Sequence, residues 1–351
     1  LPGAGRTIGQ KPEKPAAPLN AEFEFEVGEL EHAIYAKLVE KVGNRRHWED
    51  WAKDIAKIAN THIDRIQGIL ENKKNVAERS AFDAFVKEVR DDLNNSIGED
   101  EAVEMLAQHL VTKPVFDALF AGNSFAAHNP MSVAMQKVLD VRKPHRLEKE
   151  TQELEAFYAS VKLRVEGITD AAARQKVIKE LYEKFFTGAF KKMSDKLGIV
   201  YTPIEIVDFI LKSVDVLLRK EFGESLSSPG VHILDPFTGT GTFITRLLQS
   251  GLIDKEALPR KYKSEIHANE IVLLAYYIAA INIETAYQGV VGAEKYEPFE
   301  GILLTDTFEL HEKADLYDDV LKENSARRNR QKKLDIRVIV GNPPYSVGQK
   351  T

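Results

Sequence analysis

The feature that most constrains the fold is an alternation of short apolar runs with helical segments after residue 198. Strand candidates lie at Val231–Leu234, Glu265–Ala268, Gly301–Leu304 and Ile336–Val340. Between them the pattern predicts helices over Ile204–Arg219, Phe243–Gln249 and Ile271–Ala286. Strands that alternate with helices are typical of an α/β fold with a doubly wound parallel sheet. Ligands of such sheets bind at the carboxyl ends of the strands, so the residues directly after each strand are the functional candidates.

The part of the chain before this alternation is predicted to be helical, from about Phe23 to Ile168. Apolar residues recur there at helical spacing, and no alternating β-branched run interrupts them. Gly98, residues 122–130 and Pro144 supply the breaks between helices. We interpret the apolar stripes as core-packing faces, and their members include Trp48, Trp51, Phe82, Phe85, Val86, Val89 and Leu93.

Length and composition limit the possible function classes. The 351 residues suffice for two domains, and we divide the chain into a linker at 1–20, a helical domain at 21–170 and a sheet domain at 171–351. The absence of cysteine excludes disulfides, thiolate zinc sites and cysteine nucleophiles, and it suits a cytoplasmic protein. No apolar run has the length to span a membrane, and the histidines show no metal-ligand spacing.

A loop with two glycines follows the first predicted strand, in the segment from Asp235 to Phe243. Gly239 and Gly241 allow a tight turn and a close approach of ligand to backbone before the next helix begins. The segment lacks the lysine of a phosphate-binding P-loop and the third glycine of a dinucleotide fingerprint. It suits a ligand with an amino group and no phosphates, and a plain turn is the alternative.

Acidic residues follow the second and third predicted strands. Glu270 stands where the two hydroxyls of a ribose would donate hydrogen bonds to a carboxylate, with a helix N-terminal acid as the alternative. Asp306 is placed to accept from the exocyclic amine of an adenine ring, with Phe308 against the ring face. For Asp306 the alternative is a helix cap.

The most specific segment follows the fourth predicted strand and reads Asn342-Pro343-Pro344-Tyr345. Two consecutive prolines hold a rigid loop at the strand end. The N6 nitrogen of adenine is a poor nucleophile because its lone pair is delocalised into the ring. If the Asn342 amide oxygen and the Pro343 carbonyl each accept one N–H, the lone pair turns out of the ring plane. Tyr345 would stack on a base that has left its helix.

These motifs, in this order, resemble the gamma class of N6-adenine DNA methyltransferases, which have a Rossmann-like sheet. The resemblance starts at Tyr201-Thr202-Pro203, upstream of the glycine loop. It implies S-adenosyl-L-methionine as the cofactor, with Glu270 at its ribose and Asp306 at its adenine. The implied catalytic residues are Asn342, Pro343, Pro344 and Tyr345. The residues implied at the methionine end of the cofactor are Tyr201, Thr202, Pro203, Asp235, Phe237, Gly239 and Gly241.

A closer resemblance covers the helical half, through residues 120–130 and 181–186, and points to the coupler of single-chain type ISP restriction–modification enzymes. It implies double-stranded DNA as partner, with nuclease, ATPase and target-recognition domains elsewhere in the same polypeptide. The net charge of −6 agrees with a DNA surface that lies largely outside this segment. Because the chain stops soon after the catalytic loop, we expect an incomplete sheet and an inactive fragment.

Two other functions and two basic runs stay open at this point. A protein-glutamine N-methyltransferase is the nearest alternative, since the Asn-Pro-Pro-Tyr segment also suits a planar amide. A non-catalytic module that couples a DNA translocase to a recognition domain is the second alternative. The basic runs Arg327–Lys333 and Arg260–Lys263 are interpreted as solvated connections, with a DNA-facing role as the alternative.

Overall fold

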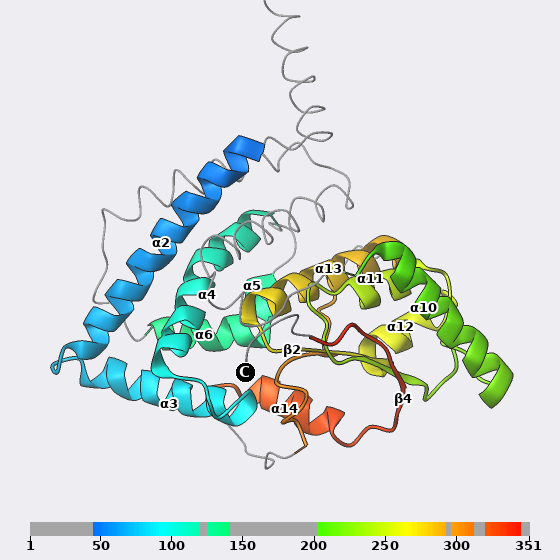
Figure 1. Cartoon of the computed structure of the whole chain (residues 1–351). Coiled ribbons are helices and arrows are strands. Elements are labelled where there is room, and N and C mark those ends of the chain that lie inside the picture. The colour runs from blue at the N-terminus through cyan, green and yellow to red at the C-terminus, as the bar shows by residue number, and fades with distance from the viewer. Residues whose placement is uncertain (1–44, 120–124, 141–201, 293–295, 312–319, 345–351) are drawn as a thin grey trace, which may run out of the picture. The chain divides into compact units, whose positions relative to one another are not determined.

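In a computed structural model of the chain, the four predicted strands pair into one parallel sheet (Figure 1). The structure describes residues 45–119, 125–140, 202–292, 296–311 and 320–344. The strands follow the order β3-β2-β1-β4, and all pairs are parallel. Their bounds are β1 (His232–Asp235), β2 (Ile266–Glu270), β3 (Ile302–Leu304) and β4 (Ile336–Ile339). The predicted α/β class is confirmed.

Helices cover both faces of this sheet, as a doubly wound fold requires (Figure 1). One face carries α10 (Ile204–Leu217), α11 (Thr242–Gln249) and α13 (Leu273–Val291), and the other carries α14 (Lys322–Gln331). The short α12 (Leu258–Arg260) precedes β2. Among the described residues β4 pairs only with β1, so it is an edge strand, and its Ile339 is 68% exposed.

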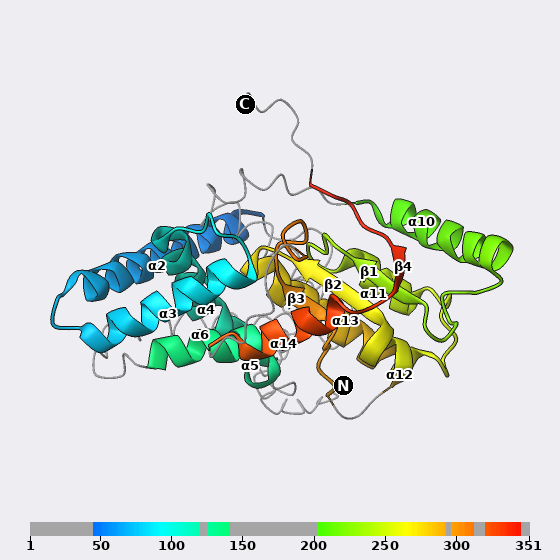
Figure 2. The same cartoon turned by 90° about the horizontal axis from the view of Figure 1, so that it is seen from below.

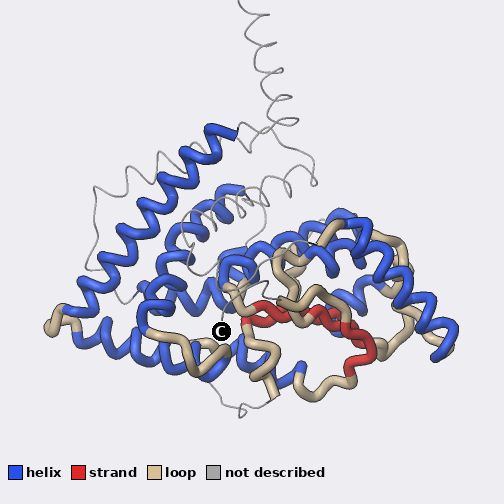
Figure 3. The backbone as a smooth tube through the Cα atoms, viewed as in Figure 1, coloured by secondary structure: helices blue, strands red, loops and turns tan. Residues whose placement is uncertain are grey.

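The described part of the helical half contains five helices, shown from below in Figure 2 and by element type in Figure 3. The predicted stripe Phe82, Phe85, Val86, Val89 and Leu93 is buried, which confirms its packing role. Residues 141–168 of the predicted helical region, and residues 181–186 of the coupler resemblance, lie outside the described residues. No helix within the described ranges has both the length and the apolar character needed to cross a membrane. The bounds are α2 (Arg45–Glu71), α3 (Val76–Asp92), α4 (Glu99–Leu119), α5 (Phe125–His128) and α6 (Pro130–Asp140).

A buried polar cluster joins α3 to α14, and we call it the docking cluster: Asp92, Asn324, Ser325 and Arg328. Asp92 and Arg328 form a fully buried ion pair. The Asp92 carboxylate also accepts from Asn324 Nδ2 at 2.9 Å and from Ser325 Oγ at 3.0 Å. Both Figure 1 and Figure 2 show α14 beside the carboxyl end of α3. Buried charges require this degree of pairing, since a lone buried ion is strongly unfavourable.

The prediction of a solvated connection at Arg327–Lys333 is wrong for its first half. Most of the run forms the end of α14, and Arg327 and Arg328 are buried. The Arg328 guanidinium pairs with Asp92 and donates a hydrogen bond to the Asp91 carbonyl at 2.9 Å. Arg330 and Lys333 are exposed as expected.

The same prediction is wrong for the centre of Arg260–Lys263, where Lys261 and Tyr262 are fully buried. Lys261 Nζ donates to the carbonyls of Ser228 and Val231 at 2.7 and 2.8 Å and pairs with Glu265. Its three N–H donors are therefore all used, which makes the buried ammonium tolerable. Tyr262 stacks on Tyr287, with ring centroids 3.7 Å apart.

Candidate functional site

The loops that follow β1 and β4 touch each other at the carboxyl edge of the sheet. Val340 N donates to the Leu234 carbonyl at 2.9 Å, so the chain leaves β4 directly beside the end of β1. A Cβ atom added to Gly341 would lie 2.6 Å from the Asp235 Oδ1 atom. Only glycine allows the backbone before Asn342 to pass this close to the carboxylate. The acid of the glycine loop and the Asn-Pro-Pro segment therefore share one site.

Both loop glycines adopt the left-handed conformation that glycine favours, with φ of +57° at Gly239 and +85° at Gly241. Their surroundings differ. A Cβ on Gly239 would meet no atom of the described residues within 4 Å, whereas a Cβ on Gly241 would lie 3.2 Å from the Ala279 backbone of α13. Gly241 thus serves the packing of the loop against α13, and Gly239 leaves open space beside the loop.

This difference predicts effects of different size and kind for two matched substitutions. Gly241→Ala combines backbone strain with a clash against α13, and we expect it to lower the free energy of unfolding by about 2–3 kcal/mol. Gly239→Ala adds only the strain, about 1 kcal/mol, but places a methyl group in the open space. Urea unfolding and ligand calorimetry on both variants separate the two roles. Equal loss of stability in the two variants would contradict this assignment.

Asp235 is the most unusual group in the site, since its side chain is completely buried. Its Oδ1 atom accepts from Phe237 N at 3.1 Å, and its Oδ2 atom meets no donor among the described residues. Burial raises the pKa of Asp235 to about 8; the Phe237 N–H opposes this rise and the Glu270 charge adds to it. A buried carboxylate oxygen without a partner is a place for a cationic ligand group.

Glu270 joins the glycine loop to the start of α13. Its Oε2 atom accepts from Gly239 N at 2.7 Å, and its Oε1 atom accepts from Ile271 N and Val272 N at 3.0 and 2.8 Å. Burial raises the pKa of Glu270 to about 7, against the three N–H groups, which lower it. The helix N-terminal role considered for Glu270 is thus present in the structure. The carboxylate also fixes the loop that carries Gly239.

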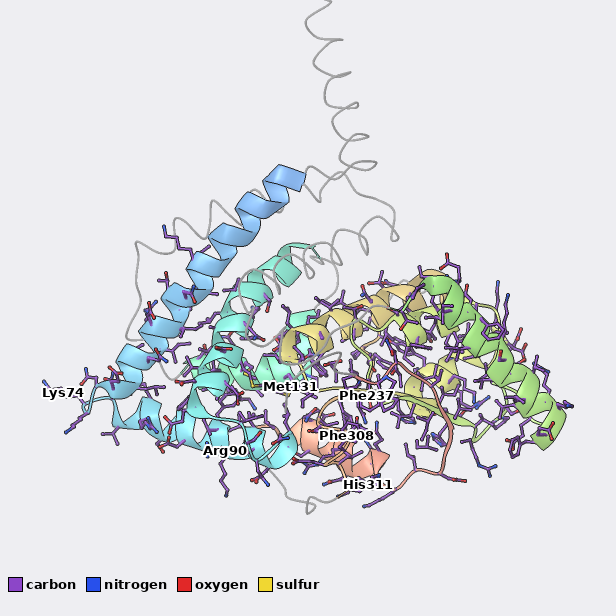
Figure 4. The ribbon with its side chains drawn as sticks, viewed as in Figure 1. Lys74, Arg90, Met131, Phe237, Phe308 and His311 are labelled. Carbon is purple, nitrogen blue, oxygen red and sulfur yellow. The ribbon has the colours of Figure 1, made fainter. Side chains whose placement is uncertain are left out.

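The segment after β3 lies beside the glycine loop. Phe308 is 70% exposed, and its ring centroid is 5.3 Å from that of Phe237 (Figure 4). Asp306 is half-buried, and its Oδ1 atom accepts from Phe308 N at 2.9 Å. The two rings form an apolar surface next to the Asp306 carboxylate, which suits a flat aromatic ligand.

Two residues that the sequence analysis did not single out hold these loops together. Thr307 Oγ1 donates to the Pro236 carbonyl at 2.7 Å and accepts from Asn269 Nδ2 at 3.2 Å. Asn269 is fully buried, and its Oδ1 atom accepts from Gln331 Nε2 at 2.9 Å. Asn269 is the penultimate residue of β2 and Thr307 lies three residues after β3, so their position near strand ends was a usable signal. The sequence analysis selected their neighbours Glu270 and Asp306 as ligand-binding candidates because these side chains are acidic.

The remaining predicted site residues are only partly described. Asn342 is half-buried, and Pro343 and Pro344 are exposed at the end of β4. Tyr345 and Tyr201 lie outside the described residues. Thr202 is half-buried and Pro203 exposed, directly before α10. The Asp208 carboxylate on α10 accepts two hydrogen bonds from Arg246 on α11, at 2.9 and 2.8 Å, which fixes α10 against the helix that follows the glycine loop.

Possible metal sites and one cavity were considered elsewhere in the described residues. No group of three or more histidine, aspartate or glutamate side chains in these ranges is placed to hold a metal ion. A cavity of about 270 Å³ lies between α14 and the sheet, with His232, His267 and Arg330 in its wall. None of the predicted site residues lines it. Burial lowers the pKa of His267 to about 4, so this histidine is neutral at physiological pH.

Two family models match the chain. Residues 47–173 match the family model of the Type ISP restriction-modification enzyme coupler domain, and residues 173–351 match that of the N-6 DNA methylases. No curated protein matches the chain.

Three solved structures are similar over most of this chain. A nuclease-deletion mutant of the Type ISP enzyme LlaGI, in complex with a DNA substrate mimic, is 48% identical, with a TM-score of 0.80 over 92% of this chain. The ATP-dependent Type ISP enzyme LlaBIII bound to DNA is 50% identical, with a TM-score of 0.81 over 95%. The DrdV–DNA complex is 34% identical, with a TM-score of 0.76 over 87%.

The chain spans only about a quarter of these proteins, covering 26%, 23% and 29% of their lengths. The family match covers the strand-end motifs from the Thr202–Pro203 segment to Asn342. The chain therefore belongs to the N-6 DNA methylase family, with the coupler domain of Type ISP restriction-modification enzymes preceding its methylase domain.

Proposed function

We propose that this chain transfers a methyl group from S-adenosyl-L-methionine to the N6 amine of a flipped-out adenine in double-stranded DNA. The observation that carries the proposal is the junction of Asp235 with the Asn342 segment at one sheet edge. One side of this junction offers an unpartnered buried carboxylate oxygen, and the other offers amide and carbonyl acceptors. Cofactor and target amine would thus meet between β1 and β4.

The residues at the end of β1 fit the cofactor. The free Oδ2 atom of Asp235 suits the cationic amino group of the methionine end, and the open space at Gly239 leaves room beside the backbone. Glu270 would accept from the ribose hydroxyls with the remaining lone pairs of its carboxylate. Asp306 and Phe308 would hold the adenine ring, and Phe237 would lie toward the methionine end, as the resemblance implies. When bound, the cofactor supplies a methyl group on a positively charged sulfur.

The Asn342 segment would activate the target nitrogen without a general base. The Asn342 side-chain oxygen and the Pro343 carbonyl would accept the two N–H bonds of the amine, which turns the lone pair toward the methyl group. The consecutive prolines keep these acceptors in place, so catalysis rests on positioning and electrostatics. The nitrogen becomes acidic once methylated and releases its extra proton to solvent. Tyr345 is assigned to stack on the extruded base.

We further propose that the chain works as part of a restriction–modification polypeptide with nuclease, ATPase and target-recognition domains. The similarity to the far longer LlaGI and LlaBIII proteins supports this assignment. A DNA substrate agrees with the cytoplasmic location expected from the composition. We propose that the segment of 351 residues does not methylate DNA alone, because β4 is an edge strand among the described residues.

The proposal is tested with the full-length protein that contains this sequence, by calorimetry with S-adenosyl-L-methionine and by methylation of DNA. We expect Asn342→Ala to lower the methylation rate about tenfold to a hundredfold while cofactor affinity stays within twofold, because the lost acceptor is assigned to the target amine and not to the cofactor. Exposed Asn95→Ala serves as the control. Methylation of a glutamine peptide in place of DNA, or undiminished activity in Asn342→Ala, would overturn the proposal.

A further inference from the structure

The turn that follows α3 in the coupler region reaches the candidate cofactor site. Asn94 lies in this turn, and its Nδ2 atom donates to the Oδ2 atom of Asp306 at 3.2 Å. Its Oδ1 atom accepts from Ser96 N within the same turn at 2.8 Å. Because the backbone of the turn occupies the amide oxygen, the amide nitrogen must face Asp306. The hydrogen bond within the turn therefore orients the Asn94 amide independently of Asp306.

Each carboxylate oxygen of Asp306 accepts one hydrogen bond, and the two donors belong to different domains. Phe308 N in the methylase domain binds Oδ1, and Asn94 in the coupler region binds Oδ2. The two bonds together define the plane of the carboxylate. Each carboxylate oxygen has room for a second hydrogen bond, so one further N–H donor can still bind.

The Asn94 turn has little freedom to move away from Asp306. Thr305 Oγ1 donates to the Asp92 carbonyl at 3.1 Å, one residue before Asp306 and two before Asn94. The Asp92 side chain is fixed in the docking cluster. One turn earlier in α3, the Glu88 Oε2 atom accepts from Val320 N and Leu321 N at 2.7 and 2.6 Å. The contact therefore belongs to a buried interface and is not an isolated surface bond.

We propose that Asn94 is a positioning residue for the cofactor, through which the coupler region takes part in reading its adenine ring. This inference rests on the proposed function, in which Asp306 accepts the adenine N6 amine. With its carboxylate plane set by Asn94, Asp306 faces the amine as an acceptor. A purine with an oxygen at position 6 would place a second acceptor opposite the Asp306 carboxylate, so it would bind more weakly than adenine.

The test compares S-adenosylhomocysteine with S-inosylhomocysteine, whose purine carries an oxygen in place of the amine at position 6 and a hydrogen on N1. Dissociation constants are measured by calorimetry on the full-length protein. Asn94→Ala is expected to weaken S-adenosylhomocysteine about fivefold, the effect of one hydrogen bond, and to leave S-inosylhomocysteine unchanged. The preference for the amine therefore falls about fivefold. Asn95→Ala, at the exposed neighbouring position, is expected to leave both constants unchanged.

The outcomes separate this inference from the proposed function. An unchanged preference in Asn94→Ala, or equal weakening of both ligands, overturns the role of Asn94, and the second result indicates a structural role only. Asp306→Ala, which removes the acceptor itself, must reduce the preference at least as much. If it does not, or if the unaltered protein binds neither ligand, the assignment of Asp306 fails and the proposed cofactor site fails with it.

Discussion

Asp235→Asn is expected to abolish cofactor binding and at the same time to stabilise the ligand-free protein at neutral pH. The amide keeps the shape of the side chain and the bond from Phe237 N, but it carries no charge for a cationic amino group. Losing one partner of a buried charge pair weakens binding by about 2–5 kcal/mol, which corresponds to a thirtyfold to several-thousandfold loss of affinity. We expect a value near the upper end, because Asp235 is completely buried.

The stabilising effect follows from the pKa of Asp235. Its pKa rises from the ordinary 3.8 to about 8 in the folded protein, so the folded state holds this proton more tightly than the unfolded state. Below pH 3.8 both states are protonated, and burial of the acid has no ionisation penalty. As the pH rises from 3.8 to about 8, the unfolded state ionises first and stability falls. Asparagine does not ionise, so it removes this fall in stability with pH. It should raise the free energy of unfolding by about 1–3 kcal/mol at pH 7.

Urea unfolding between pH 4.5 and 8.5 provides the measurement, with calorimetry for the affinity. The unfolding free energies of the two proteins should converge toward the acid end and separate as pH rises. Asp254→Asn, at an exposed position, controls for the loss of a negative charge. Parallel stability curves for Asp235→Asn and the unaltered protein, or an affinity reduced less than tenfold, would contradict the assignment.

Arg328→Met is expected to have the largest effect on stability, a loss of about 3–5 kcal/mol. It leaves the fully buried Asp92 carboxylate without its counter-charge, although Asn324 and Ser325 still donate to it. Removing one partner of a buried pair is strongly unfavourable, whereas replacing both with apolar residues of similar volume is much less so. The double variant Asp92→Leu with Arg328→Met should therefore recover most of the loss.

A matched control lies on the same helix. Arg330 pairs with Glu300 at 3.5 Å, and the two side chains are 60% and 52% exposed. Solvent screens such a pair, so Arg330→Met should change the unfolding free energy by less than about 0.5 kcal/mol. Urea unfolding of the unaltered protein, the single variants Asp92→Leu and Arg328→Met, and the double variant gives the coupling energy between Asp92 and Arg328. A loss below about 1 kcal/mol in Arg328→Met would show that the docking cluster contributes little to stability.

The sequence predicted the sheet well because each strand is a short apolar run bounded by residues that stop it. The chemistry of the strand ends was also visible, since in a parallel sheet the residues after the strands must gather at one edge. Helix α14 was missed, because Lys322–Gln331 has no apolar stripe. It is held by ion pairs and amide contacts with α3, which no periodic pattern reveals.

The contact between Asn94 and Asp306 was equally beyond prediction from the sequence. The two residues are separated by 212 positions, and no sequence motif around either one indicates that they are in contact. Local patterns indicate where elements begin and end, but they do not specify which element packs on which. The proposed contribution of the coupler region to the cofactor site could therefore be inferred only from the three-dimensional structure.

The docking cluster also has a consequence for synthesis on the ribosome. Asp92 and Ser325 are 233 residues apart, so at ordinary rates of elongation about 12 to 47 seconds pass between their translation. During that interval α3 has emerged while its charge partner has not been made. The contacts of the docking cluster, which cross the family boundary near residue 173, therefore form only after α14 has been synthesised.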